Sequence, residues 1–299
     1  MNLLDQILRH KKQEVEKAKA ARPEGELQKR IASIAKPIGF QKALRSGGFG
    51  IIGEIKRKSP SMSQMIPANV EEAPGAYEAS ALIKAVSILT DQKYFGMGIE
   101  DLDALKRKIG KPVLRKDFIF DDYQVLEARA FGADAILLMV SVLGKEPLRR
   151  LFERSADLGM DVLFECHSLE EIQLLPAQAQ ICGINSRKFN VGQNSFRYRA
   201  SRLAGRFKLF GRFGVKDFST DLDVFKQLIG HLPKSAVKVA ESGLSPSGIA
   251  AVQELGFDCA LIGTSFLKSP MGVGRTIEQF VEVLEARRQQ KPASLLDGV

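Results

Sequence analysis

FGIIGEIK, at residues 49–56, is a short apolar run of strand length that ends on a lysine. Seven more strand-like apolar runs follow along the chain, and they end near Leu89, Lys116, Met139, Glu165, Asn185, Ala240 and Ile262. Most of the runs are followed by an amphipathic helical stretch, such as Ile99–Ile109, Tyr123–Ala130 and Glu146–Leu158. Strand and helix alternating eight times predict an α/β fold, a (β/α)8 TIM barrel.

The chain has 299 residues, which suits one barrel plus an extension. Residues 1–48 are predicted as an N-terminal helical extension with two helices, Leu3–Ala21 and Glu24–Leu44. Residues 49–299 are predicted to form the barrel. Successive strand ends lie 20 to 33 residues apart, except that Ala240 follows Asn185 by 55 residues. We therefore expect an inserted loop at about residues 188–216, after the sixth strand and on the face where barrel active sites lie.

The net charge of +9 comes from one segment, because residues 186–216 contain nine basic residues and no acidic residue. The remainder has 35 basic and 35 acidic residues and is neutral. Aromatic residues are interleaved with the basic ones, a pattern that RNA or an acidic partner could recognise. A loop on the catalytic face that begins at Arg187 is better explained as a lid that attracts an anionic substrate. We expect the lid, with nucleic-acid binding as the weaker alternative.

Cellular location and cofactors follow from what the sequence contains. No apolar run reaches the length of a membrane span, and the N-terminal stretch is charged, so we expect a cytoplasmic protein without membrane contact. Cys166, Cys182 and Cys259 lie within predicted strands, which predicts buried free thiols. The three histidines are too scattered to indicate a metal site. We expect no metal and no cofactor, and a monomer.

Polar residues at the strand ends are the candidates for chemistry. Side chains of a strand alternate, so a residue two positions from an inward apolar residue also points inward. This rule directs six polar side chains to the barrel mouth: Glu54, Lys56, Lys116, Glu165, Asn185 and Glu241. A structural ion-pair network is the alternative, but six such residues at strand ends of this fold favour catalysis.

Two glycine-containing turns indicate a phosphate site. Glu241-Ser242-Gly243 follows the seventh strand, and Gly263-Thr264-Ser265 follows the eighth. Small turns at these two positions of a barrel often bind phosphate through backbone N–H groups. The substrate is therefore predicted to be a phosphate ester.

These motifs together resemble the indole-3-glycerol phosphate synthase family of tryptophan biosynthesis. The matching stretches are residues 52–61 (IGEIKRKSPS), 87–91 (SILTD), 93–95 (KYF), 113–118 (VLRKDF), 183–187 (GINSR) and 241–243 (ESG). The resemblance implies a carboxy-lyase that converts 1-(2-carboxyphenylamino)-1-deoxyribulose 5-phosphate into indole-3-glycerol phosphate, carbon dioxide and water. It also implies that neither cofactor nor metal takes part.

Roles for the mouth residues follow from the resemblance. Lys116 would be the general acid that protonates the ketone oxygen, and Glu165 its acid/base partner. Glu54 and Asn185 would orient the substrate hydroxyls and the proton donors. Lys56 would either contact phosphate or act as the acid of the dehydration step. Independently, ring closure and dehydration need two acid/base pairs, and a lysine near other cations and partly desolvated releases its proton more easily.

Binding residues are implied in the same way. Ser59 and Arg187 would bind the substrate, Phe118 would pack on its ring, and Glu241 would support the site. Phosphate would be held by Ser242, Gly243, Gly263 and Thr264. The chain departs from the family pattern after the first strand, with Met62-Ser63, after the sixth, with Ser186 and Lys188-Phe189, and in the insertion.

Two other functions are compatible with a barrel. Phosphoribosylanthranilate isomerase, or another phosphate-binding barrel, would need a Cys and Asp pair, whereas Cys166 and Cys182 lie inside strands and not at the end of the first. A barrel without activity, kept as a binding or scaffold protein, would not require the charged strand ends. Both are ranked below the synthase.

Overall fold

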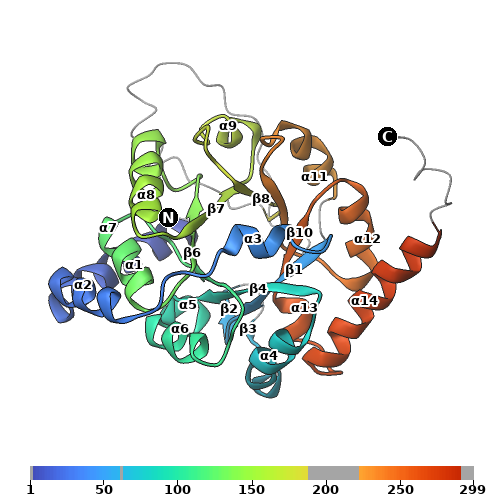
Figure 1. Ribbon diagram of the computed structural model, residues 1–299, viewed down its shortest axis with the longest axis horizontal. Coiled ribbons are helices and arrows are strands. Elements are labelled where there is room, and N and C mark those ends of the chain that lie inside the picture. The colour runs from blue at the N-terminus through green and yellow to red at the C-terminus, as the bar shows by residue number, and fades with distance from the viewer. Residues whose placement is uncertain (1–2, 61–62, 188–221, 291–299) are drawn as a thin grey trace.

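Eight parallel strands close into a barrel in the computed structural model, which describes residues 3–60, 63–187 and 222–290 (Figure 1). The barrel strands are β1 (Gly50–Ile55), β4 (Ile83–Leu89), β5 (Val113–Lys116), β6 (Ala135–Met139), β7 (Asp161–Cys166), β8 (Ile181–Asn185), β9 (Val237–Glu241) and β10 (Cys259–Ile262). They pair in chain order, and β10 closes the barrel against β1. The TIM-barrel prediction is confirmed, and each predicted strand end lies within one residue of an observed one.

Alternation along the strands separates two hydrophobic layers. Ile52, Leu114, Leu163 and Val239 belong to the core inside the barrel. Their strand neighbours, such as Ile51, pack in the larger core between the strands and the helices. Residues two positions beyond the inward ones therefore also point inward, and this geometry brings polar strand ends to the barrel mouth.

Helices surround the strands (Figure 1). Those that follow strands of the barrel and exceed one turn are α4 (Pro67–Ala79), α6 (Ile99–Lys106), α7 (Asp122–Ala130), α8 (Lys145–Asp157), α11 (Leu222–Leu228), α12 (Pro246–Glu254) and α14 (Val273–Gln290). Short elements that the sequence did not predict lie in the loops: α5 (Gln92–Phe95), α9 (Leu169–Ile172), α13 (Thr264–Leu267), a 3₁₀ turn (Ile229–His231) and a hairpin of β2 (Lys58–Ser59) with β3 (Ser63–Gln64). Gly132 and Gly159 follow α7 and α8 with φ of 90° and 73°, a left-handed conformation that ends a helix.

The N-terminal extension contains three helices where two were predicted. Helix α1 (Leu3–Ala21) is as expected, but the predicted Glu24–Leu44 helix divides into α2 (Glu24–Ser33) and α3 (Phe40–Arg45). The prediction was wrong in the middle because Pro37 disfavours helical backbone at the residue before it. The break lets α3 turn across the amino-terminal end of the barrel, where Phe40 joins the interior core (Figure 1).

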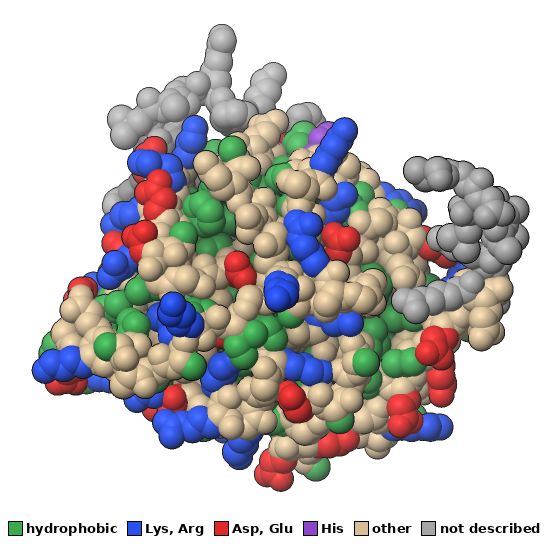
Figure 2. All heavy atoms as spheres, in the orientation of Figure 1, with side chains coloured by type: hydrophobic (Ala, Val, Ile, Leu, Met, Phe, Trp, Pro, Cys, Tyr) green, Lys and Arg blue, Asp and Glu red, His purple; other side chains and the backbone are tan. Residues whose placement is uncertain are grey.

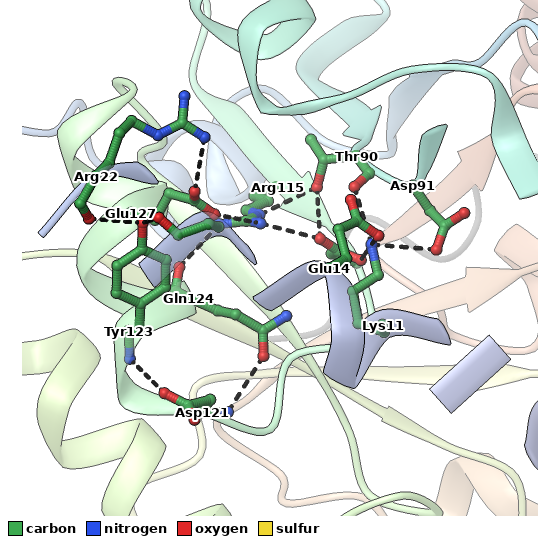
Figure 3. Close-up of polar contacts among 12 residues, drawn as sticks. Lys11, Glu14, Arg22, Thr90, Asp91, Arg115, Asp121, Tyr123, Gln124 and Glu127 are labelled. Atoms are coloured by element: carbon green, nitrogen blue, oxygen red, sulfur yellow. Dashed lines mark hydrogen bonds and ion pairs between the residues drawn. The ribbon is translucent and has the colours of Figure 1, made fainter. Parts of the chain in front are cut away.

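Helix α1 is tied to the barrel by buried ion pairs (Figure 3). Lys11, whose side chain is 2% exposed, contacts Asp91 at 3.1 Å and Asp117 at 2.9 Å. Arg115 joins Asp117 to Glu127, both at 3.0 Å. We call these residues, with Glu14 and Arg22, the anchor cluster, since Lys11 also contacts Glu14 and Arg22 contacts Glu127. The cluster fixes α1 against the segment that follows β5.

Basic and acidic side chains are interspersed on the face that α3 covers (Figure 2), as the charge balance outside residues 186–216 predicts. Among the described residues, none of the helices is both long enough and apolar enough to span a membrane. The predicted insertion at 188–216 lies outside the described residues. Its role as a lid, and the domain boundary at residue 48, stay predictions.

Candidate active site

A cavity of about 250 Å³ opens at the carboxyl ends of the strands. Its lining includes twelve of the thirteen residues singled out in the sequence: Glu54, Lys56, Lys116, Phe118, Glu165, Asn185, Arg187, Glu241, Ser242, Gly243, Gly263 and Thr264. The thirteenth, Ser59, is 5% exposed in the β2–β3 hairpin and is not in the lining. The alternation rule therefore brings residues from β1, β5, β7, β8 and β9 to one place.

Lys116 is the centre of the charged lining. Its Nζ donates to Glu165 Oε2 at 2.9 Å and lies 3.5 Å from Glu241 Oε2. Burial by itself would lower the pKa of Lys116, but Glu165, Glu241 and Glu54 together raise that pKa above its ordinary value. The expectation that cationic neighbours lower the pKa of a lysine is wrong for Lys116, because three carboxyl groups surround its Nζ. Lys116 is a protonated acid in the resting site.

Glu165 and Glu241 share Lys116 and differ in charge. Burial favours the neutral form of each, yet Lys116 and His167 lower the pKa of Glu165 below its ordinary value. Burial and the nearby Glu165 charge raise the pKa of Glu241. Two carboxyl groups whose pKa values are shifted in opposite directions supply a base and a neutral acid at neutral pH.

Glu54 and Lys56 form a second pair at the end of β1, which β4 separates from β5 and Lys116. They are two residues apart at the end of β1, so both point inward, and Lys56 Nζ donates to Glu54 Oε1 at 2.5 Å. Burial raises the pKa of Glu54, but Lys56 and then Lys116 outweigh burial and lower it below its ordinary value. The mouth thus holds two separate lysine–carboxylate pairs. We call Glu54, Lys56, Lys116, Glu165 and Glu241 the mouth cluster.

Two glycines make room for these carboxylates, a role for Gly183 that sequence reasoning missed. A Cβ at Gly183 would stand 2.1 Å from Glu241 Oε1, and one at Gly263 would stand 2.6 Å from Glu54 Oε1. Both distances are far inside van der Waals contact, so any side chain at these positions would displace a carboxylate. The GIN stretch at residues 183–185 was the available signal, since Gly183 shares the inward phase of Asn185.

Asn185 connects the phosphate turn to the Lys116–Glu165 pair. Its Nδ2 donates to Glu165 Oε1 at 3.0 Å, and its Oδ1 accepts from Ser242 Oγ at 2.7 Å. The Arg187 backbone N–H also donates to Asn185 Oδ1 at 3.0 Å. Asn185 is therefore held in one orientation, and movement of Ser242 would reach Glu165 through it.

The two predicted turns lie side by side at the mouth. Ser242 and Gly243 have consecutive positive φ values of 78° and 68°, and they follow β9. Gly263 follows β10, which pairs with β9, and precedes α13. Both turns line the cavity. Successive backbone N–H groups in a turn can form a concave surface suited to an anion.

Apolar residues form the opposite wall. Leu89, Phe95, Phe118 and Met139 line the cavity. Phe118 and Met139 pack in one cluster with Leu4 and Ile7 of α1, and Phe95 packs against that cluster. Apart from Phe118, these residues were not predicted as site residues, because a lone apolar residue at a strand end or in a loop gives no signal that distinguishes it from core.

His167 was also missed as a site residue. It follows β7, and its Nε2 lies 3.4 Å from Glu165 Oε1. The sequence contained a signal, since His167 is two residues from Glu165 and so shares its phase. The three cysteines, in contrast, are buried and free as predicted. Cys166 and Cys182 pack in the outer core, away from the mouth, so the isomerase alternative gains no support.

Residues 4–203 match the family model described as indole-3-glycerol phosphate synthase. The chain belongs to the indole-3-glycerol phosphate synthase family. A relative of that name from Bacteroides thetaiotaomicron is 34% identical over 286 residues, covering 95% of this chain and 99% of the relative. Another from Thermoanaerobacter pseudethanolicus is 36% identical over 270 residues, covering 89% of this chain and 92% of the relative. The family suggested by the sequence motifs is thus confirmed.

The fold is also found in a distant solved structure. The 3-hexulose-6-phosphate synthase of Salmonella typhimurium superposes with a TM-score of 0.54 at 15% identity, covering 79% of this chain and 99% of that one. At this identity the likeness shows the barrel fold alone.

Proposed function

We propose that this mouth performs the reaction of the family: the carboxy-lyase activity of an indole-3-glycerol phosphate synthase. The substrate is 1-(2-carboxyphenylamino)-1-deoxyribulose 5-phosphate, and the products are indole-3-glycerol phosphate, carbon dioxide and water. The observation that carries the proposal is the buried Lys116–Glu165 pair, joined at 2.9 Å within a cavity that also contains a second pair, Lys56–Glu54. Ring closure and dehydration each require an acid and a base.

Lys116 serves the ring closure. As the aromatic ring attacks the ketone carbon, the oxygen gains negative charge and needs a proton. Lys116 is protonated and holds that proton at Nζ, beside Glu165 Oε2. Once Lys116 has given up the proton, Glu165 Oε2 loses its cationic partner and becomes a stronger base. Loss of carbon dioxide returns the electron pair of the broken C–C bond to the ring, which thereby regains aromaticity, so no electron sink is required.

Lys56 and Glu54 serve the dehydration. The hydroxyl that leaves as water must be protonated, and Lys56 Nζ is the nearest described cation to Glu54, at 2.5 Å. Glu54 is ionised because Lys56 and Lys116 outweigh the effect of burial on its pKa. The pair therefore supplies a second donor and a second acceptor within the same cavity.

Substrate binding is divided between the two walls. The turns at Ser242-Gly243 and Gly263-Thr264 bind the phosphate, while Phe118 packs on the aromatic ring. Arg187 attracts the anionic substrate. We further infer a cytoplasmic monomer in which the basic segment acts as a lid, with nucleic-acid binding ranked lower.

The test is formation of indole by the purified chain. Indole fluorescence should appear when the protein meets the carboxyphenylamino-deoxyribulose phosphate, and Glu165→Gln should lower turnover by ~10²–10⁴ because an acid/base group is lost. Glu153→Gln, a surface carboxylate 57% exposed on α8, is the matched control and should leave turnover unchanged. Absence of fluorescence with a folded parent protein would refute the proposed function.

A further inference from the structure

His167 lies directly behind the mouth cluster and takes no part in the steps above. It follows β7, so the strand alternation places its side chain on the same side as Glu165. Nε2 of the imidazole is 3.4 Å from Glu165 Oε1, and the side chain is 13% exposed. The described residues that line the cavity include Glu165 but not His167. His167 therefore contacts the base from the side remote from substrate.

A second carboxylate holds the other side of the ring. Nδ1 of His167 lies 3.4 Å from Glu171 Oε2, and the same oxygen accepts the His167 backbone N–H at 2.8 Å. Glu171 lies in α9, whose preceding residue Ser168 accepts the Glu171 backbone N–H through Oγ. Glu171 is 7% exposed at its side chain. Its position is thus fixed by the local fold at the end of β7.

The surroundings of the imidazole favour its charged form. Both ring nitrogens lie 3.4 Å from a carboxylate oxygen, and the Nε2 contact with Glu165 is an ion-pair contact without hydrogen-bond geometry. Three charged groups face His167: Glu165 from β7, Glu171 from α9 and Lys116 from β5. Burial lowers the pKa of His167 and so does Lys116, but Glu171 and Glu165 outweigh them and raise it above its ordinary value.

The two oxygens of Glu165 are consequently used differently. Oε1 faces Asn185 Nδ2 at 3.0 Å and His167 Nε2 at 3.4 Å, whereas Oε2 faces Lys116 at 2.9 Å. We propose that His167, clamped by Glu171, is a positioning residue that fixes the Glu165 carboxylate so that Oε2 alone is presented to Lys116 and the substrate. This inference rests on the proposed function only in assigning Glu165 the role of base.

Three variants of the full-length protein separate the positioning role from simple packing. His167→Ala removes the donor and should lower kcat about tenfold, less than the ~10²–10⁴ that loss of the base itself causes. KM should change little because His167 does not touch substrate. His167→Gln places an amide N–H near the position of Nε2 and should recover most of kcat. His231→Gln, an exposed histidine of the 3₁₀ turn, is the matched control and should behave as the parent.

The dependence of kcat on pH would not change if His167 served only to fill space in the core, so it tests the positioning role. In the parent, kcat should fall as pH rises through the raised pKa of His167, because the ring then loses one donor. Glu171→Gln removes a negative neighbour, lowers that pKa and should move the fall to lower pH. His167→Gln has no titrating ring, and the fall should disappear. NMR titration of the imidazole in the substrate-free protein should show a pKa of His167 above the ordinary value of histidine.

Each of these measurements either supports or refutes the positioning role of His167. Rescue by Gln, a shifted profile for Glu171→Gln and a raised pKa of His167 support the positioning role. Equal losses of kcat in the Ala and Gln variants, or an unchanged profile in Glu171→Gln, would overturn it. If the parent formed no indole, the proposed function would fail, while the NMR titration would still report whether His167 is held as a cation between Glu165 and Glu171.

Discussion

The end of β5 contributes neighbouring side chains to two buried ionic clusters with different properties. Arg115 and Asp117 point outward into the anchor cluster, where Lys11 lies within 3.1 Å of Asp91 and Asp117. Lys116 points inward to the mouth cluster. The anchor cluster joins α1 to the barrel and pairs each buried acid with a cation (Figure 3). The mouth cluster borders a cavity and includes Glu241, neither of whose oxygens accepts a hydrogen bond from the described residues; in the anchor cluster this holds for one oxygen each of Glu14 and Asp91.

The comparison teaches that burial of charge alone does not identify an active site. Both clusters contain lysine and carboxylates that are almost fully buried. Acids outnumber cations in both clusters, four to three in the anchor cluster and three to two in the mouth cluster. In the anchor cluster every acid contacts a cation, and the pairing holds α1 in place. All five members of the mouth cluster line the cavity, and there the pKa values of Glu165 and Glu241 are driven apart. Opposed pKa shifts of carboxyl groups that line a cavity are typical of a catalytic site.

The difference between the two clusters is tested most directly by making the same Lys→Met substitution in each of them. Lys116→Met should lower kcat by ~10²–10⁴, since the acid of ring closure is lost. Its unfolding free energy should fall less than that of Lys11→Met, because water can enter the cavity and Glu241 already carries a proton. Indole fluorescence and urea unfolding measure the two effects. Near-parent turnover of Lys116→Met would remove its assigned role, and Lys226→Met, at an exposed helix position, is the control.

Lys11→Met should show the opposite balance. Removing one partner of a buried ion pair leaves Asp91 and Asp117 uncompensated, which costs about 3–5 kcal/mol of unfolding free energy. Turnover per folded molecule should fall far less than in Lys116→Met. Lys12→Met changes the exposed neighbour on α1 and should stay within about 0.5 kcal/mol of the parent. Equal stability of the Lys11 and Lys12 variants would show that the anchor cluster does not hold α1.

The dependence of the unfolding free energy on pH tests the charge state of Glu241 in the mouth cluster. Burial and Glu165 raise the pKa of Glu241 to about 8, whereas an unfolded glutamate titrates at its ordinary value. Between about pH 5 and 8 the folded state keeps a proton that the unfolded state releases, so stability falls as pH rises, by about 1 kcal/mol per pH unit. His167, with a raised pKa, adds the same trend only above its ordinary value.

Glu241→Gln isolates the contribution of Glu241. The variant cannot release a proton at this position, so its unfolding free energy, measured in urea across pH 5 to 8, should fall less steeply than that of the parent. Glu165 does not interfere in this window, since its lowered pKa affects stability only at more acidic pH. Parallel slopes for variant and parent would mean that Glu241 is ionised in the folded protein.

Strand periodicity explains why most of the site could be predicted. A two-residue repeat carries the direction of a side chain from Leu114 to Lys116 and from Leu163 to Glu165 without any knowledge of distant contacts. The family motifs then supplied the roles. The same local rule holds for His167, but its partner Glu171 depends on the short helix α9, which the sequence did not reveal.

Contacts distant in sequence could not be predicted. Lys11 meets Asp117 across 106 positions, and nothing near residue 11 indicates a buried lysine. The surroundings of Lys116 were misjudged for the same reason, because its proton is held by carboxylates from three other strands. Glu24–Leu44 was divided by Pro37, which sequence reasoning passed over. The local sequence pattern predicts the direction in which a side chain points, whereas the packing between elements decides the charge state of that side chain.

The smallest expected effect concerns the turn that joins the phosphate site to the mouth cluster. Ser242→Ala removes the hydrogen bond to Asn185 Oδ1 at 2.7 Å and one hydroxyl from the cavity wall. A neutral hydrogen bond contributes about 0.5–1.5 kcal/mol, so KM should rise by roughly 2- to 10-fold. Turnover should fall less, because Asn185 still accepts the Arg187 N–H and still donates to Glu165.

Inorganic phosphate, used as a competitive inhibitor, distinguishes two roles of Ser242: binding the phosphate group and supporting Glu165 through Asn185. If the turn binds phosphate, inhibition should weaken in Ser242→Ala by the same factor as KM rises, whereas Ser33→Ala on α2 should change neither. If kcat falls while KM and phosphate inhibition stay at parental values, Ser242 acts on Glu165 through Asn185 and not on phosphate. The phosphate cradle would then depend on backbone N–H groups of the two turns, which Gly263→Ala cannot test cleanly because its Cβ would displace Glu54.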